Sequence, residues 1–341
     1  MEAAVPVVPE AEPAAVVTPV GGQPPRFEFS DRFEHNERKF VLVTSAICVI
    51  LMAACACASV AAPTVFGEFY PAMATNFVVI FLAEVAWRAL LSCVAYRYAD
   101  RYKRTLNYTR KLGNCFRLFK LFVFGDFLPS MRNEPVTILF TFGLDQLLYI
   151  VMFSHHVRRR ENPLGWTCRF LFLQQDRPED RPDTLIYQVT EDLMRFAVYI
   201  PFRLIVQTYL PGHSIIIYIP LTVNNIGDGL AEPVGIYCST WFRKKLNLDV
   251  TYSTRSLWTS DGGFWSGSFR RSFPGSACVF FTTMIVLCVE HDQFSRGQLV
   301  FLLFTMPFWM TVTEAIAPHT NDGPFLAAMG CGLLVVALVL V

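Results

Sequence analysis

Long apolar runs separated by short polar segments fill the chain from residue 40 to its end. A helix that crosses a lipid bilayer needs about 20 mostly apolar residues. Five runs approach or reach that length with at most one charged residue, and they cover residues 40–62, 136–154, 273–288, 299–313 and 324–341. The pattern predicts a polytopic integral membrane protein.

Four further runs carry ionisable residues within apolar sequence. They are residues 72–98 with Glu84 and Arg88, 112–128 with Arg117 and Lys120, 193–210 with Arg195 and Arg203, and 215–237 with Asp228 and Glu232. Charged side chains are costly in lipid, so these helices are expected to face a protein interior or a wet cavity. Run 112–128 is the weakest of the nine. The fold class predicted is an all-α bundle of about eight or nine transmembrane helices.

The first 38 residues lack this pattern. Pro, Ala, Val and Glu alternate there without a helical or strand period, and Gly21-Gly22 and Pro24-Pro25 interrupt any regular element. Such a composition predicts a disordered tail. The tail has neither the basic start nor the continuous apolar stretch of a signal peptide. We therefore expect a tail over 1–38 and one membrane domain over 39–341.

Composition narrows the class of protein. Apolar residues make up 53% of the chain and charged residues only 17%, against about 25% in an average soluble domain, and there are 31 Phe. These values exclude a soluble enzyme, a disordered protein and a disulfide-stapled secreted module. The net charge of +1 predicts no nucleic-acid partner.

Because successive spans cross the membrane in opposite directions, the loops between them fall alternately on its two sides, and the charged residues of these loops are unequally divided. One side receives most of the bases, which are Arg38, Lys39, Arg97, Arg101, Lys103, Arg104, Arg110, Lys111, Arg158, Arg159, Arg160, Arg243, Lys244, Lys245, Arg255, Arg270 and Arg271, together with His155 and His156 as interfacial loop residues. The other side receives Glu68, Asp126, Glu134, Glu290 and Asp292. Since Lys and Arg accumulate on the cytoplasmic face, the basic side is expected to be cytosol-like and to hold the N-terminus.

Four polar strings lie at span ends, and alternation places all four on the basic side. They cover residues 110–114, 224–235, 270–277 and 314–324. Together they supply acids, bases, amides and glycines at one level of the membrane. Kinking glycines and charged side chains that extend to the interface would explain any one string, but four on one face favour a functional site.

Phosphoryl transfer is the chemistry that suits these strings. Asp228 lies between two glycines and could hold Mg²⁺, which prefers a few carboxylates plus substrate phosphates. Basic residues of the strings could neutralise a triphosphate, and Gly275 with Ser276 at a helix start offers free N–H donors. Glu314 and Asp322 could complete a metal shell or orient an alcohol. No Gly-Lys dipeptide occurs, so there is no P-loop.

At these strings the chain resembles the membrane family of dolichol kinase, phytol kinase and CTP-dependent diacylglycerol kinase. Residues 227–235, Gly-Asp-Gly-Leu-Ala-Glu-Pro-Val-Gly, are similar to the family's Gly-Asp motif, and residues 271–276 are similar to its basic-Ser-x-x-Gly-Ser string. Arg110-Lys111 and residues 314–324 are similar to two further family motifs. The resemblance covers about residues 105–325.

The resemblance implies a multi-pass enzyme that transfers the γ-phosphate of CTP, or of ATP, to the hydroxyl of a long-chain lipid alcohol such as phytol, a polyprenol or diacylglycerol, with Mg²⁺. Three positions depart from the family pattern: Asn114 replaces a His, Pro274 stands where Glu is frequent, and Gly323 where Asn is. Residues 252–270 form a longer loop than the family's.

The candidate residues follow from the strings and the resemblance together. The candidate catalytic residues are Asp228, also the metal ligand, with Arg110, Lys111 and Glu314. The candidate nucleotide-binding residues are Asn225, Gly227, Gly229, Gly235, Arg271, Ser272, Gly275 and Ser276. The expected partners are the lipid alcohol, the nucleoside triphosphate and membrane lipids. The endoplasmic reticulum is the first expected location and the plastid membrane the second.

Three alternatives remain at this stage. A cytidylyltransferase that makes a CDP-lipid from CTP and phosphatidate would use similar groups. Asn114 and Pro274 also allow a catalytically inactive member that serves as a membrane scaffold subunit. The charged spans suggest a transporter, but the chain shows no internal repeat.

Overall fold

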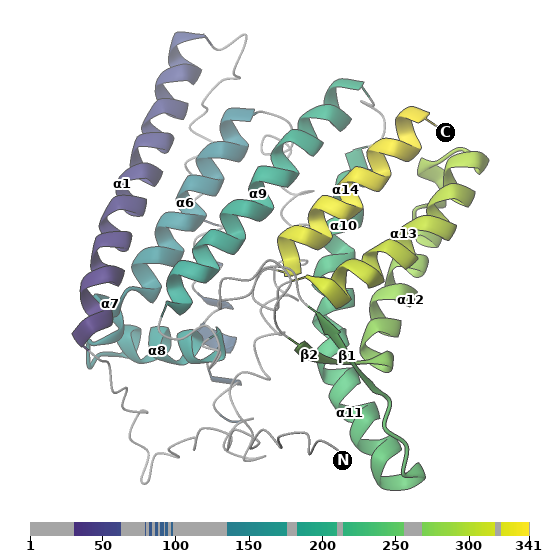
Figure 1. Ribbon diagram of the computed structural model, residues 1–341. Helices are drawn as coiled ribbons and strands as arrows, with labels where there is room; N and C mark the ends of the chain where they lie inside the picture. The colour runs from purple at the N-terminus through teal and green to yellow at the C-terminus, as the bar shows by residue number, and fades with distance from the viewer. Residues whose placement is uncertain are drawn as a thin grey trace, which may run out of the picture.

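The computed structural model describes residues 31–62, 135–175, 183–209, 214–255, 268–317 and 322–340, with isolated positions between 79 and 97. Its main helices and strands are α1 (Asp31–Ala61), α6 (Pro135–Phe153), α7 (His155–Arg158), α8 (Pro163–Gln175), α9 (Thr184–Tyr209), α10 (Tyr218–Thr222), α11 (Gly229–Leu246), β1 (Thr251–Arg255), β2 (Ser268–Ser272), α12 (Phe273–Val289), α13 (Arg296–Ile316) and α14 (Asp322–Leu340). Figure 1 shows the long helices side by side in a tilted bundle, with α8 running across one end.

Helices occupy the predicted apolar runs in the described residues. Among the described residues, three helices are long and apolar enough to cross a membrane, at Glu37–Ala61, Arg296–Ile316 and Asp322–Leu340, and two shorter apolar helices lie at Phe142–Phe153 and Phe273–Val289. The all-α class is therefore confirmed, and these helices are consistent with membrane association. The run 112–128 and most of 72–98 lie outside the described residues.

Helix α1 begins at Asp31, within the tail expected over residues 1–38. A helix of 31 residues is about 46 Å long at 1.5 Å per residue, whereas the hydrocarbon core of a bilayer is about 30 Å thick. The charged residues that precede the apolar run at residue 40 therefore lie inside the helix. The first turns of α1 extend beyond its apolar segment.

A buried ion pair secures this extension of α1. The Arg158 side chain is 1% exposed and its Nη2 donates to both carboxylate oxygens of Glu37, at 2.9 and 2.8 Å. Its guanidinium also lies 3.6 Å from the centroid of the Phe172 ring in α8. Arg158 and His155 are thus buried, contrary to their expected place in an interfacial loop, whereas His156 and Arg159 are exposed. The difference arises because Glu37 belongs to the unpredicted part of α1.

Within the described part of the chain, two buried apolar clusters hold the helices together. One joins α9, α10, α12, α13 and α14 through residues such as Val206, Ile219, Leu287, Met306 and Leu334. The other joins α1, α6, α8 and α9 through Cys48, Ile150, Phe172 and Val189. Helix α9 contributes to both clusters and so connects the two halves of the bundle.

The outer faces of the bundle are apolar as well. Large side chains such as Ile50, Phe281, Phe304 and Leu340 are at least 60% exposed. Soluble monomers rarely expose apolar surface on this scale, and lipid is the solvent that suits it.

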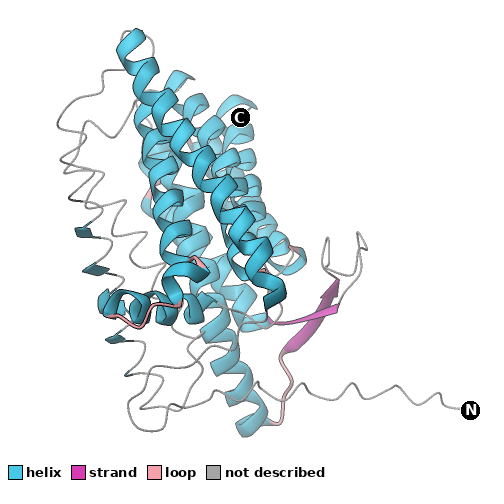
Figure 2. Cartoon of the chain, turned by 90° about the vertical axis from the view of Figure 1, so that its left-hand side faces the viewer, coloured by secondary structure: helices cyan, strands magenta, loops and turns pink. Residues whose placement is uncertain are grey.

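Helix α11 ends in a turn that leads into a short hairpin. Asn247 adopts a left-handed conformation, with φ 49° and ψ 35°, that Asn tolerates better than most residues. Strands β1 and β2 then pair antiparallel, in a register that runs from Thr251 opposite Ser272 to Arg255 opposite Ser268. Figure 2 shows the two strands beside one end of the helical bundle. The loop predicted over 252–270 is therefore paired at both of its ends, where Thr and Tyr side chains favour strands.

Candidate functional site

The run predicted over 215–237 is helical throughout, but it is not a regular α-helix. A 3₁₀ turn at Ser214–Ile217 leads into α10, a π-helical turn follows at Val223–Asp228, and α11 begins at Gly229. Asp228 is therefore the last residue of the π-helical turn. Such π turns inside helices are rare and are frequently found at functional sites.

Gly227, directly before Asp228, serves helix packing. Gly227 is helical, and a Cβ placed on it would lie 3.3 Å from the Cα of Val279 in α12. Neither Gly227 nor Gly229 lines the cavity described below, and the same holds for the buried Asn225. The close approach that glycine permits at position 227 is therefore to α12. The ligand-contact role predicted for these three residues remains untested.

Helices α11 and α12 cross closely at a second set of predicted residues. A Cβ on Gly235 would collide with Ser272 Oγ, and a Cβ on Gly275 would lie 2.8 Å from the carbonyl oxygen of Ala231. Ser272 is the N-cap of α12, and its Oγ accepts a hydrogen bond from the Gly275 N–H at 3.2 Å. Pro274 occupies the first turn of α12, a place where proline is well tolerated. The Ser-Phe-Pro-Gly string is therefore a helix start built against a glycine of α11.

A buried polar network connects the hairpin, α12 and α13. Arg271 of β2 donates from Nη1 to Glu314 Oε1 at 2.8 Å, and their side chains are 15% and 4% exposed. Ser276 Oγ donates to Glu314 Oε2 at 3.4 Å, and the Tyr252 hydroxyl is hydrogen-bonded to the same Ser276 Oγ. Burial raises the pKa of Tyr252, so its hydroxyl is protonated at neutral pH and can donate to Ser276. The network fixes the position of the Arg271 guanidinium.

A cavity of about 350 Å³ lies between α11, the hairpin and the ends of α12, α13 and α14. Of the predicted residues, the cavity brings together Asp228, Gly235, Arg271, Ser272, Gly275, Ser276 and Glu314. Asp322, from the fourth string, also lines it. Three of the four polar strings thus meet at one site. The remaining string, with Arg110 and Lys111, lies outside the described residues.

Arg270, one of the bases expected to neutralise a triphosphate, also lines the cavity. The other wall residues were not singled out from the sequence as ligand contacts, and they are Ala231, Glu232, Ile236, Ser239, Arg243 and Thr251. Helical spacing from Asp228 could have found part of this set, since residues 228, 232, 235, 239 and 243 recur every three or four positions. The Ser239 hydroxyl is buried and has no hydrogen-bond partner among the described residues.

The acidic residues of the cavity bear on the metal and nucleotide expected from the sequence. Carboxylates of Asp228, Glu314 and Asp322 line the cavity, and the first and third lie close enough to Glu314 to act on it electrostatically. Within the described residues no group of three or more His, Cys, Asp or Glu is arranged to hold a metal ion by itself. Mg²⁺ that arrives with phosphates needs only one or two protein carboxylates. The residues present therefore fit a metal bound together with its nucleotide.

Substitution of Gly235 by Ala is expected to disturb this site through packing. The added methyl group would collide with Ser272 Oγ, so the N-cap of α12 must shift or its hydrogen bond must break. We expect a loss of about 1–3 kcal/mol in unfolding free energy, as for other overpacked sites, and weaker nucleotide binding. Thermal unfolding of the purified protein in detergent and nucleotide titration measure the two effects.

A matched control is Gly332→Ala in α14, where a Cβ meets no atom within 4 Å. That substitution is expected to leave stability unchanged or to raise it slightly, since Ala is the better helix former. Equal behaviour of the two variants would show that the close approach at Gly235 has no energetic weight.

Comparisons of the chain with protein-family models, with curated proteins and with solved structures found no match.

Proposed function

We propose that this chain is a membrane-embedded lipid-alcohol kinase that uses CTP, or ATP, with Mg²⁺. The observation that carries the proposal is the meeting of three polar strings, separated by up to about a hundred residues of sequence, around one cavity lined by acids, arginines and a helix start. The helices that form the cavity also carry the exposed apolar faces that suit lipid. A polar reaction site and an apolar substrate tail can thus be served by one bundle.

In this proposal the cavity binds the triphosphate by charge and by position. Arg271 lines the cavity with its orientation set by Glu314, and its remaining N–H groups are available for phosphate oxygens. The first turn of α12 adds the positive end of a helix dipole. Mg²⁺ held by Asp228 would neutralise charge on the phosphates.

The transfer itself needs no covalent enzyme intermediate. The oxygen of the lipid hydroxyl forms a bond to the γ-phosphorus, the bond from that phosphorus to the β–γ bridging oxygen breaks, and CDP leaves. The hydroxyl proton passes to a carboxylate of the cavity or to water. Catalysis then rests on positioning and charge neutralisation, as is usual for phosphoryl transfer.

The finer topology belongs to the same proposal. It comprises about eight or nine spans, a basic side that faces the cytosol, and a location in the endoplasmic reticulum or, second, in a plastid membrane. In this topology the nucleotide would reach the cavity from the aqueous phase on the basic side. The start of α1, α7 and the end of α11 lie at one end of the bundle, which supports this orientation (Figure 1).

A labelling assay tests the proposal. The purified full chain, in nanodiscs, is given CTP or ATP labelled at the γ-phosphate together with phytol, a polyprenol or diacylglycerol. Transfer of γ-label to one of these alcohols supports a kinase. Transfer of α-label from CTP to phosphatidate would instead show a cytidylyltransferase. The absence of both transfers, together with no Mg²⁺-dependent nucleotide binding, would favour an inactive scaffold subunit.

A further inference from the structure

The cavity continues past the proposed reaction site along one face of α11. From Asp228 to Arg243 this face rises about 22 Å at 1.5 Å per residue. The inner end carries Asp228, Arg271 and Glu314, whereas the outer end is lined by Arg243, Thr251 and Arg270. At this outer end the predicted phosphate chemistry included Arg270 but neither Arg243 nor Thr251.

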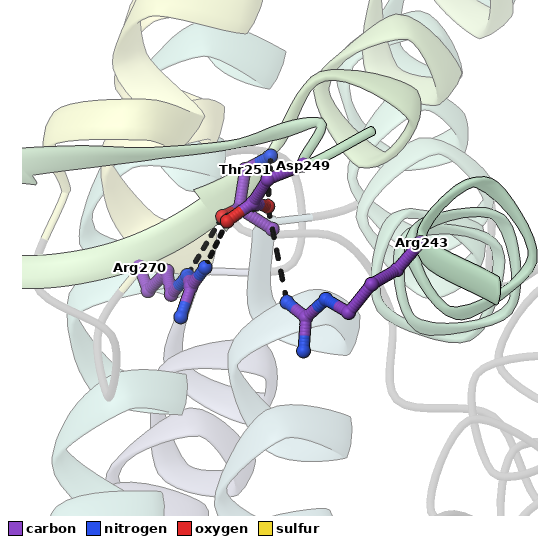
Figure 3. Close-up of polar contacts among 4 residues, drawn as sticks. All are labelled: Arg243, Asp249, Thr251 and Arg270. Atoms are coloured by element: carbon purple, nitrogen blue, oxygen red, sulfur yellow. Dashed lines mark hydrogen bonds and ion pairs between the residues drawn. The ribbon is translucent and has the colours of Figure 1, made fainter. Parts of the chain in front are cut away.

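A single carboxylate, Asp249, holds both arginines of the outer end. Its Oδ2 is paired with Arg270 Nη2, and its Oδ1 lies 3.8 Å from Arg243 Nη2. The Thr251 hydroxyl donates to Asp249 Oδ1 and accepts from Arg270 Nε, each at 2.7 Å. Figure 3 shows Asp249 and Thr251 between the two guanidinium groups, with Arg243 reaching across from α11. Asp249 itself does not line the cavity, although both of its arginine partners do.

These contacts are exposed and therefore easy to exchange. The side chains of Arg243, Asp249 and Arg270 are 59%, 52% and 60% exposed. Ion pairs between exposed side chains contribute little to stability, so a competing ligand can replace them. The hydrogen bond from Thr251, with smaller contributions from Arg270 and Arg243, lowers the pKa of Asp249, so this carboxyl is ionised at neutral pH. Two cations and one anion leave a net positive charge at this outer end of the cavity, which we call the mouth.

We propose that Arg243 and Arg270 form a second anion site at the mouth of the cavity, which binds the polyphosphate of the incoming nucleotide, and that Asp249 is its built-in competitor. Without ligand the carboxylate occupies both arginines. A polyphosphate carries several negative charges and can accept from both guanidinium groups at once, so it displaces the single carboxylate. Asp249 thereby excludes weaker, singly charged anions from the mouth.

Substitution of Asp249 by Asn tests the competition directly. The proposal rests on the proposed function for its ligand, so binding is measured with two probes, CTP and inorganic tripolyphosphate. The purified full chain is placed in nanodiscs of neutral phosphatidylcholine, which removes anionic headgroups as a rival source of phosphate. We expect Asp249→Asn to tighten binding of both probes about threefold or more, and Arg243→Gln or Arg270→Gln to weaken it by a similar factor.

Matched controls separate the mouth from general charge effects. Asp292→Asn changes the net charge as Asp249→Asn does but lies in the turn between α12 and α13, and Lys245→Gln matches Arg243→Gln on α11 without lining the cavity. Neither control is expected to change binding by more than about 1.5-fold. The double variant Asp249→Asn/Arg243→Gln should lose most of the gain of Asp249→Asn alone, since the carboxylate acts through the arginines.

The outcomes distinguish the two proposals. If the wild type binds CTP and transfers its γ-phosphate while Asp249→Asn and Arg243→Gln behave like their controls, the mouth proposal is overturned and the kinase proposal stands. If tripolyphosphate binding follows the expected pattern but no transfer occurs, the anion site stands and the kinase proposal fails. An effect of Arg243→Gln that is present only with anionic lipid would assign the mouth to a lipid headgroup and overturn the nucleotide site.

Discussion

Replacement of Asp228 by Asn is expected to lower the rate of phosphoryl transfer about 10²- to 10³-fold. Asp228 ends the π-helical turn, lines the cavity and lies near Glu314, so it contributes negative charge where Mg²⁺ and phosphates would meet. Asn has nearly the same shape but no charge. Loss of a single preorganised electrostatic contact in an active site costs a factor of this size.

The quantity measured is the initial rate of γ-label transfer at saturating lipid alcohol, and thermal unfolding is measured on the same preparations. Unfolding should differ little between the variant and the wild type. A suitable control is Glu290→Gln. Glu290 directly follows Val289, the last residue of α12, and does not line the cavity. Retention of the wild-type rate within threefold by Asp228→Asn would remove Asp228 from the proposed mechanism.

The helical class of this protein could be predicted from its sequence because apolar periodicity over 15 to 25 residues is a strong local signal. The meeting of the Gly-Asp string, the Ser-Phe-Pro-Gly string and Glu314 could also be expected, since membrane alternation placed them on one face. Alternation of the spans does not show on which face of its helix each residue of a string lies. Gly227 and Gly229 belong to a predicted string, yet they do not line the cavity, because the residues next to Asp228 in a helix are turned about 100° away from the face that Asp228 shares with Gly235 and Arg243.

Two other features depend on contacts between segments that are distant in sequence. Arg158 has the sequence context of a surface cation, and only the unexpected extension of α1 brings Glu37 to it. The sequence of the hairpin has no alternation of apolar and polar residues that would predict strands. Its two strands nevertheless place Tyr252 opposite Arg271, and both side chains belong to the buried polar network at the cavity. Local patterns predict elements, but they do not predict which long-range partner converts a charged residue from exposed to buried.

The pair of Arg271 and Glu314 yields the second large effect. Glu314→Ala is expected to destabilise the protein by about 3–5 kcal/mol, because it leaves Arg271 in a largely buried position without its carboxylate and deprives Ser276 of an acceptor. Thermal or denaturant unfolding in detergent measures the loss. Thr254→Val is the matched control, since it removes a neutral hydrogen bond to the backbone of Ala315, one residue beyond Glu314, and should cost only about 1 kcal/mol.

A double variant separates the structural role of the pair from its role in the reaction. Arg271→Gln/Glu314→Gln removes both buried charges and retains groups that can hydrogen-bond, so most of the lost stability should return. Activity should not return, because the phosphates would then have no fixed guanidinium at the inner end of the cavity. If the double variant regains both stability and transfer, the pair is structural only. If Glu314→Ala is no less stable than Thr254→Val, the buried pair carries no more energy than an ordinary hydrogen bond, and the fixed position of Arg271 must have another cause.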